Sequence, residues 1–199
     1  MKDIVFDLGG VLIDWNPRHL YKKVFSTEAE MEWFLANVCT PQWNTQQDAG
    51  RPFAEGIELL KSKYPEYTFA IEFYRSRWEE MLGGEIAGSV EILRNLKTRG
   101  YRVYALSNWA AETFALIKEK YGFLRAFDGI MISGEEKLVK PDPKIYARLL
   151  KKYDLHASNC IFIDDNTANI SKAADLGFET ILFTGSDALH RTLSSRGIL

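Results

Sequence analysis

The spacing of apolar residues divides the chain into two kinds of segment. From Ser89 onward, short apolar runs alternate with amphipathic stretches that end at glycines. The runs "RVYALSN", "GIMIS", "CIFIDD" and "TILF" have strand length, and an earlier run ends at Asp7. Helices are expected over residues 89–97, 111–120, 143–153, 168–176 and 186–197. This alternation predicts parallel βαβ units and a sheet covered by helices on both faces.

Helical spacing dominates the segment between the first strand and Leu82. Asn16 and Pro17 resemble a helix start, and Thr27 and Glu30 fit a capping box. Two apolar stripes follow at helical spacing, and the second ends before Gly83 and Gly84. No strand is expected in this stretch. The stripes are Met31, Phe34, Leu35 and Val38, and then Ile71, Tyr74, Trp78 and Met81.

The predicted fold is therefore α/β, a doubly wound parallel sheet of Rossmann-like type with a small helical insertion after the first strand. The sheet and its helices take residues 1–14 and 84–199, and the insertion takes residues 15–83. Within the insertion, the polar segment "WNTQQDAGRPF" is expected to be a loop that meets a ligand. Asp48 and Arg51 in that loop are candidate specificity residues, although an exposed charged loop would look the same.

The composition of the chain limits the classes of partner that it is expected to bind. The chain has 199 residues, of which 46% are hydrophobic, and 25 basic residues stand against 27 acidic ones. Without a basic run, nucleic acid and anionic membranes are poor candidates, and a small-molecule ligand fits better. Two distant cysteines without metal-ligand spacing suggest buried thiols in a reducing compartment. With no leader and no long apolar run, the expected location is cytoplasmic.

Polar residues follow three of the predicted strands where each strand ends. Asp7 ends the first strand, Ser107 and Asn108 end the second, and Asp164 and Asp165 end a later one. Lys140 follows another strand in "KLVKPD". The carboxyl ends of parallel strands meet at one edge of a sheet, so these side chains should converge. Clustered carboxylates repel each other and favour a hard cation such as Mg²⁺, and a phosphate would balance the remaining charge.

Together these residues resemble the four motifs of the haloacid dehalogenase-like superfamily, in order and over nearly the whole chain. The resemblance implies that Asp7 is a nucleophile that forms an aspartyl-phosphate. It implies phosphate-binding roles for Ser107, Asn108 and Lys140. It also implies a Mg²⁺ site made of Asp7, the Gly9 carbonyl and Asp165, with Asp164 acting through a water molecule.

The same resemblance gives roles to residues around the site. Asn169 would support the metal ligands, and the helical insertion would be a cap that covers the site and selects the substrate. Trp109, directly after the second motif, should face the pocket, where it would stack on a sugar or form a wall.

Gly9 departs from the family pattern. Most phosphatases of this superfamily have a second Asp at that position, which donates a proton to the leaving group. Its absence predicts discrimination by leaving group and leaves the source of the proton open, with Asp14 and Asp48 as candidates. The form "DLGGVL" resembles bacterial sugar-phosphate phosphatases that act on α-glucose 1-phosphate.

Three functions remain open from the sequence. The first is a Mg²⁺-dependent phosphomonoesterase that acts on a small phosphorylated metabolite, such as a sugar phosphate. The second is a metal-independent haloacid dehalogenase, although Asp164 and Asp165 would repel its carboxylate substrate. The third is a catalytically weak homologue that binds the ligand without turnover.

Overall fold

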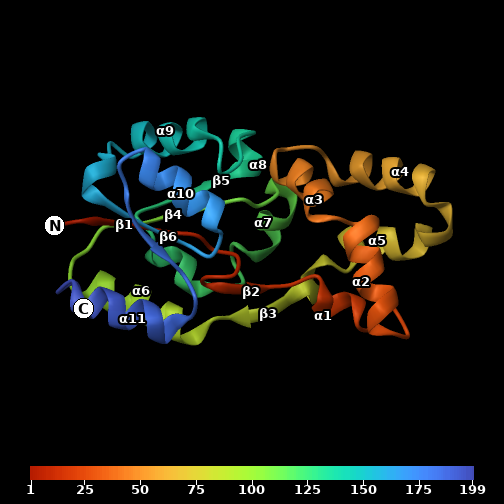
Figure 1. The fold of residues 1–199 in the computed structure, drawn as a ribbon, viewed down its shortest axis with the longest axis horizontal. Helices are drawn as coiled ribbons and strands as arrows, with labels where there is room; N and C mark the ends of the chain where they lie inside the picture. Colours follow the sequence, from red (N-terminus) through yellow and green to blue (C-terminus); the bar gives the residue numbers. More distant parts are fainter.

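The computed structural model describes residues 1–199 and contains one five-stranded parallel sheet (Figure 1). The sheet order is β5-β4-β1-β6-β7, and every neighbouring pair is parallel. Its strands are β1 (Asp3–Phe6), β4 (Val103–Ser107), β5 (Gly129–Ile132), β6 (Cys160–Asp164) and β7 (Glu179–Leu182). The predicted doubly wound α/β fold is confirmed.

Helices cover both faces of this sheet. In Figure 1, α9 and α10 lie above the strands, and α6 and α11 lie below them. The helices of this part are α6 (Ala87–Thr98), α7 (Ala111–Ile117), α8 (Ser133–Glu136), α9 (Pro143–Lys152), α10 (Thr167–Asp175) and α11 (Ser186–Ser195), with the 3₁₀ helices η3 (Gly122–Ala126) and η4 (Ala157–Asn159). Each predicted helix of this region is present within a few residues of its expected ends.

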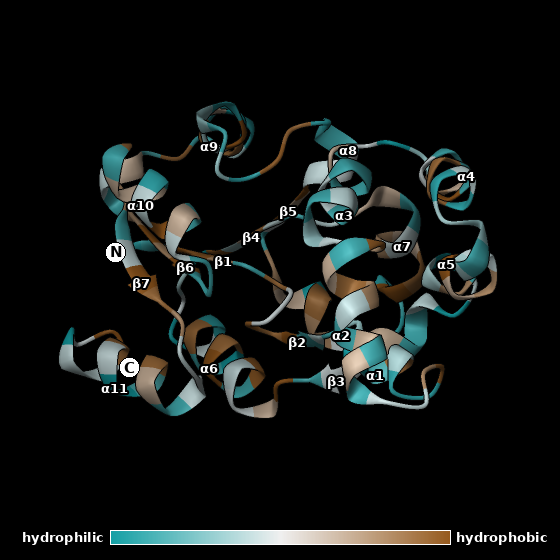
Figure 2. Cartoon of the chain, turned by 45° about the vertical axis from the view of Figure 1, so that its right-hand side comes forward, coloured by the Kyte–Doolittle hydropathy of each residue, from teal (hydrophilic) through white to brown (hydrophobic).

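Successive residues of a strand face opposite sides, and this alternation builds two cores. Along β1, Ile4 and Phe6 belong to one apolar cluster, whereas Val5 belongs to the other. Strands buried on both faces read as nearly continuous apolar runs, as β6 does in "CIFI". Figure 2 shows hydrophobic colour on these strands and mixed colour on the surrounding helices.

The helical insertion lies at the end of the molecule opposite the two termini (Figure 1). Its helices are α1 (Arg18–Tyr21), α2 (Glu28–Asn37), α3 (Pro41–Asp48), α4 (Phe53–Lys63) and α5 (Thr68–Ser76), with the 3₁₀ helices η1 (Pro65–Tyr67) and η2 (Trp78–Met81). The Thr27–Glu30 capping box begins α2, as predicted. All eight residues of the two predicted stripes are buried.

Two features of this region differ from the expectations. A short antiparallel ribbon, β2 (Ile13–Trp15) with β3 (Leu82–Glu85), joins the insertion to the sheet, and this pairing was not predicted. Furthermore, much of the polar segment expected to be a loop is helix α3. Thr40 caps that helix by accepting from the backbone N–H of Trp43, and Pro41 occupies its first turn.

Two further findings concern the cysteines and the length of the apolar helices. Cys39 and Cys160 are both buried and unpaired, in agreement with the sequence expectation. No helix in the structure combines the length and apolar character that crossing a bilayer requires.

Candidate active site

The carboxyl end of β1 lies at the point where the winding of the sheet reverses. From β1 the chain builds β4 and β5 on one side, and later β6 and β7 on the other. Ligands of open α/β sheets bind in the crevice at such a reversal. The three predicted strand ends therefore meet there, with Asp7 between Ser107 of β4 and Asp164 of β6.

Asp7 is 8% exposed, and its carboxylate is held by several donors. Its Oδ1 accepts from the backbone N–H of Leu8 at 2.7 Å and from Ser107 Oγ at 2.6 Å. Burial raises the pKa of Asp7 to about 7. Lys140 and Ser107 oppose this rise, whereas Asp164 adds to it. A cation bound at this edge would favour the ionised form of Asp7.

The ammonium group of Lys140 is completely buried between two carboxylates. Its Nζ lies 2.6 Å from Asp164 Oδ2 and 3.1 Å from Asp7 Oδ1, and it donates to the Leu106 carbonyl at 2.8 Å. Burial alone would lower the pKa of Lys140, but Asp7 and Asp164 raise it above its ordinary value. Lys140 is therefore a permanent cation beside the candidate nucleophile.

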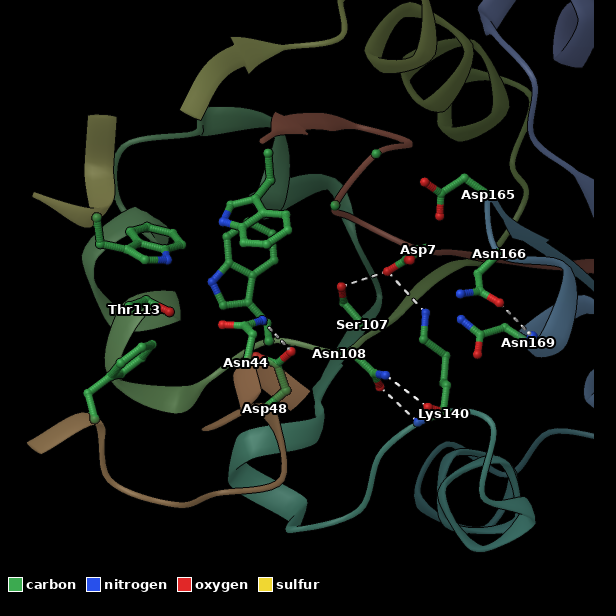
Figure 3. A pocket seen from close by; sticks show the side chains of 16 residues that line it. Asp7, Asn44, Asp48, Ser107, Asn108, Thr113, Lys140, Asp165, Asn166 and Asn169 are labelled. Carbon is green, nitrogen blue, oxygen red and sulfur yellow. Dashed lines mark hydrogen bonds and ion pairs between the residues drawn. The ribbon is translucent and has the colours of Figure 1, made fainter. Parts of the chain in front are cut away.

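The side-chain amide of Asn108 forms two hydrogen bonds with the backbone of Lys140. Its Nδ2 donates to the Lys140 carbonyl at 2.9 Å, and its Oδ1 accepts from the Lys140 N–H at 2.8 Å. In Figure 3 these two bonds appear as parallel dashed lines. The side chain of Asn108 thus fixes the segment that carries the ammonium group.

The adjacent acids Asp164 and Asp165 occupy different environments. Asp164 is fully buried and accepts from Lys140, from the backbone N–H of Asn166 at 2.8 Å and from Asn169 Nδ2 at 3.0 Å. Asp165 is exposed and lines the cavity. Desolvation by the surrounding chain and the charge of Asp164 raise the pKa of Asp165. Asn169 supports Asp164, as the family resemblance implies.

Asp7, Asp164 and Asp165 together form a cluster that suits a hard cation. Each offers a carboxylate oxygen, and these atoms lie within 4.8 Å of one another. Gly10 leaves room for the cluster, because a Cβ at that position would collide with the Asp165 carboxylate. A set of oxygen donors with excess negative charge is the chemistry that Mg²⁺ prefers. The residues present therefore fit the ion.

Gly9 and Gly10 have different backbone requirements. Gly10 has a φ of +75°, which L-residues with a side chain rarely adopt, whereas Gly9 has no positive φ. A Cβ built at Gly9 would lie 3.8 Å from the Trp109 ring, which is an ordinary contact. Position 9 can therefore accommodate a Cβ.

A cavity of about 350 Å³ opens between this edge of the sheet and the helical insertion. Its polar side contains the motif residues that line it, and Trp15, Phe53, Trp78 and Trp109 form an aromatic wall. Trp109 is 5% exposed, and its indole Nε1 is the one buried side-chain polar atom without a hydrogen-bond partner. An unsatisfied buried donor costs about 1–3 kcal/mol, so this N–H favours a ligand that offers an acceptor.

The insertion contributes two polar side chains to the cavity, Asn44 and Asp48, both from α3 (Figure 3). Asp48 was a sequence candidate, and the structure places it at the cavity. Arg51, the other candidate, bonds Gln47 and the Trp43 carbonyl and does not line the cavity. Asp14 pairs with His19 at 2.9 Å on the connecting ribbon and does not line it either.

Sequence reasoning missed several cavity residues. Asn44 lies one helical turn before Asp48, so the i, i+4 spacing would have been a usable signal had α3 been recognised as a helix. Asn166 caps α10, a role that its place after a strand also suggests. Phe53 ends the segment that was expected to meet a ligand, although it was not singled out there, whereas Thr113 has no local signal because only the tertiary fold brings it to the cavity.

The chain is similar in sequence to several proteins that are named as phosphatases. The chain is 28% identical to a sesquiterpene phosphatase of Aspergillus oryzae over 187 aligned residues. These residues make up 93% of this chain and 91% of that protein. It is 25% identical to a phosphorylated carbohydrates phosphatase of Thermotoga maritima, over 91% of this chain and 84% of that one.

A solved structure supports the fold. The magnesium complex of a HAD family enzyme from Bacteroides thetaiotaomicron has a TM-score of 0.72 and 22% identity, over 93% of this chain and 94% of that one. In addition, residues 1–177 match the family described as haloacid dehalogenase-like hydrolase. With the strand-end residues gathered at one edge and this match over most of its length, the chain belongs to the haloacid dehalogenase-like hydrolases.

Proposed function

We propose that the protein is a Mg²⁺-dependent phosphomonoesterase that acts on a small phosphorylated metabolite through an aspartyl-phosphate. One observation carries this proposal. A buried carboxylate, Asp7, has a hydroxyl donor 2.6 Å away and an ammonium group 3.1 Å away, beside two further carboxylates at the same sheet edge. The relatives named for phosphatase activity support the same reaction class.

Each residue would have a distinct role in this reaction. Asp7 would attack phosphorus with a carboxylate oxygen, which forms the covalent intermediate. Ser107 Oγ and Lys140 Nζ would then bind the phosphoryl oxygens and stabilise the charge that builds up in the transition state. The side-chain amide of Asn108 is already hydrogen-bonded to the Lys140 backbone, so Asn108 would bind the phosphate through its own backbone N–H.

Asp7, the Gly9 carbonyl and Asp165 would hold the Mg²⁺ ion, with Asp164 acting through a water molecule. When bound, the ion would supply positive charge that neutralises the nucleophile and the phosphoryl oxygens. Asp164 would also orient Lys140, since it already accepts a 2.6 Å hydrogen bond from Nζ.

Residues 15–83 would act as the cap, because α3, the start of α4 and η2 provide the wall opposite the motif residues. The aromatic wall suits the apolar face of a sugar or another flat organic group. A sugar phosphate is the substrate class that we favour, and the indole N–H of Trp109 would bind one of its oxygen atoms. The cytoplasmic location stays a prediction.

A panel of sugar, alkyl and aryl phosphates tests this function, assayed with Mg²⁺ and with EDTA beside a halide-release assay on 2-chloropropionate. We expect phosphate release that requires Mg²⁺ and that Asp7→Asn abolishes. Full phosphatase activity in excess EDTA would contradict the proposal, and halide release would indicate the dehalogenase. Ligand binding without any turnover would indicate the catalytically weak homologue.

A further inference from the structure

The glycine at position 9 leaves the proposed reaction without a proton donor in the nucleophile loop. When the P–O bond breaks, the leaving oxygen of an alkyl ester needs a proton. Four ionisable residues line the cavity. Three of them, Asp7, Lys140 and Asp165, are used as nucleophile, phosphate ligand and metal ligand. The fourth is Asp48.

Asp48 is fixed to the core although it belongs to the insertion. Its carbonyl accepts from Ser133 Oγ at 2.6 Å, and the same Oγ accepts from the backbone N–H of Trp109 at 2.9 Å. One hydroxyl thus ties the end of α3 to the residue that follows Ser107 and Asn108. After Asp48 the chain turns at Gly50, which has a positive φ, and a Cβ at that position would lie 3.3 Å from the Gly134 carbonyl oxygen. The position of Asp48 is therefore set relative to the strand end that contacts the nucleophile.

The Asp48 side chain is also held in place. Asn44 Nδ2 donates to Asp48 Oδ2 at 3.0 Å, and Tyr74, which is buried, donates its hydroxyl to Asn44 Oδ1 at 3.0 Å. In Figure 3 the Asp48 carboxyl stands beside Asn44, on the insertion side of the cavity. Through Asn44, a buried tyrosine thus fixes a carboxyl group that lines the cavity.

The surroundings of Asp48 set its protonation near neutral pH. Burial raises the pKa of Asp48 to about 7, against a smaller effect of the Ala110 backbone. The nearby charges are Asp7, which adds to the rise, and Lys140, which opposes it. Arg51, three residues after Asp48, donates to Gln47, and Glu112 of α7 accepts from the Phe53 N–H. A carboxyl group half protonated at neutral pH can both donate and accept a proton.

We propose that Asp48 is the catalytic acid and base that the chain uses in place of a carboxylate at position 9, an inference that rests on the proposed function. As an Asp7 oxygen bonds to phosphorus and the ester P–O bond breaks, the Asp48 carboxyl proton passes to the leaving alkoxide, which departs as an alcohol. Asp48 is then a carboxylate. It takes a proton from the water that attacks the phosphorus of the aspartyl-phosphate, which releases hydrogen phosphate and restores Asp7 as a carboxylate.

Asp48→Asn tests this role, because the amide keeps an oxygen that can accept from Asn44 but cannot donate an acidic proton. The probe is a leaving-group series from p-nitrophenyl phosphate to an alkyl phosphate. We expect kcat/KM for the alkyl ester to fall about 10²- to 10⁴-fold, and that for the p-nitrophenyl ester by less than about tenfold. Glu55→Gln, an exposed charge change on α4, is the matched control and should change neither value.

A rescue variant separates catalysis from packing. Position 9 accommodates a Cβ, so Gly9→Asp in the Asp48→Asn background should restore much of the alkyl phosphate rate. Equal losses on all esters would assign Asp48 a structural role and overturn the proposal, as would an unchanged alkyl rate in Asp48→Asn.

Two outcomes of the parent protein also decide the matter. Without a replacement acid, glycine at position 9 predicts strong discrimination by leaving group. With Asp48 as the acid, the parent should instead hydrolyse alkyl and aryl phosphates at similar rates, and a steep dependence on the leaving group would overturn the proposal even if Asp48→Asn failed to fold. If the parent showed no Mg²⁺-dependent activity on any ester, the proposed function itself would fail, and this inference with it.

Discussion

Replacing Lys140 with methionine should reveal how strongly the candidate site depends on one buried cation. Its Nζ is the only cation between Asp7 and Asp164, and all three groups are buried. Removing one partner of a buried ion pair typically costs about 3–5 kcal/mol, because the remaining charge is left without compensation. We therefore expect Lys140→Met to lower the free energy of unfolding by about this amount at pH 8.

The loss should shrink as the pH falls. Lys140 holds the pKa of Asp7 down, so without the ammonium group the pKa of Asp7 in the folded state rises further above its value in the unfolded chain. For Asp7 that unfolded value is 3.8, and the folded value is already about 7. Between these values the folded state binds more protons than the unfolded state, so stability falls as the pH rises. The destabilisation should be smaller at pH 5 than at pH 8.

Urea denaturation at both pH values measures this effect, in EDTA so that no divalent cation replaces the lost charge. Lys120→Met is the matched control, because Lys120 forms an exposed ion pair with Glu79 at 2.8 Å. Surface pairs contribute about 0–1 kcal/mol. The reasoning is refuted if the two variants lose the same stability at pH 8, or if the loss for Lys140→Met is independent of pH.

Two more predictions concern the residues around the proposed metal site. Gly10→Ala should lower the free energy of unfolding by about 1–3 kcal/mol, because of the positive φ and the collision with Asp165. Gly9→Ala should change it by less than about 1 kcal/mol, and equal losses in thermal unfolding would contradict this contrast. Asp165→Asn should stay folded but lose the Mg²⁺-induced stabilisation, which in the parent reaches about 2.7 kcal/mol at a hundred times the Kd. A normal Mg²⁺-induced Tm shift in that variant would exclude Asp165 as a ligand.

The sheet was predictable because its physical signal is strong. Strands buried on both faces give apolar runs, and the helices between them end at glycines such as Gly100 and Gly177, which have positive φ. The convergence of Asp7, Ser107 and Asp164 then followed from a general property of parallel sheets rather than from local sequence.

The insertion was harder to predict for two physical reasons. The ribbon strands β2 and β3 are only three and four residues long, and β3 contains Gly83 and Gly84, which normally indicate a break. Helix α3 has few apolar residues, so its apolar spacing gave no helical signal. Its start depends on the Thr40 cap and Pro41, and its packing on Trp43 and Gln47, the two residues that it buries.

The different environments of Asp164 and Asp165 also required the structure. The family resemblance assigned them different roles, but in sequence they are adjacent and chemically identical, so nothing local predicts which one is buried. Only the tertiary contacts with Lys140 and Asn169 show that Asp164 belongs to the buried network, whereas Asp165 faces the cavity.

The ribbon of β2 and β3 also bears on how such a chain can change over evolutionary time. Asp14 pairs directly with Gly84, so the chain leaves the sheet and returns to it one strand spacing apart, about 5 Å. A loop of that kind tolerates large changes of length, since doubling it adds only about 0.6 kcal/mol of closure entropy. Different helical modules can therefore be exchanged at this point while the nucleophile stays in place. If Asp48 is the catalytic acid of this chain, exchanging the helical insertion would remove the proton donor together with the residues that contact the substrate. The new insertion would then have to supply a proton donor of its own.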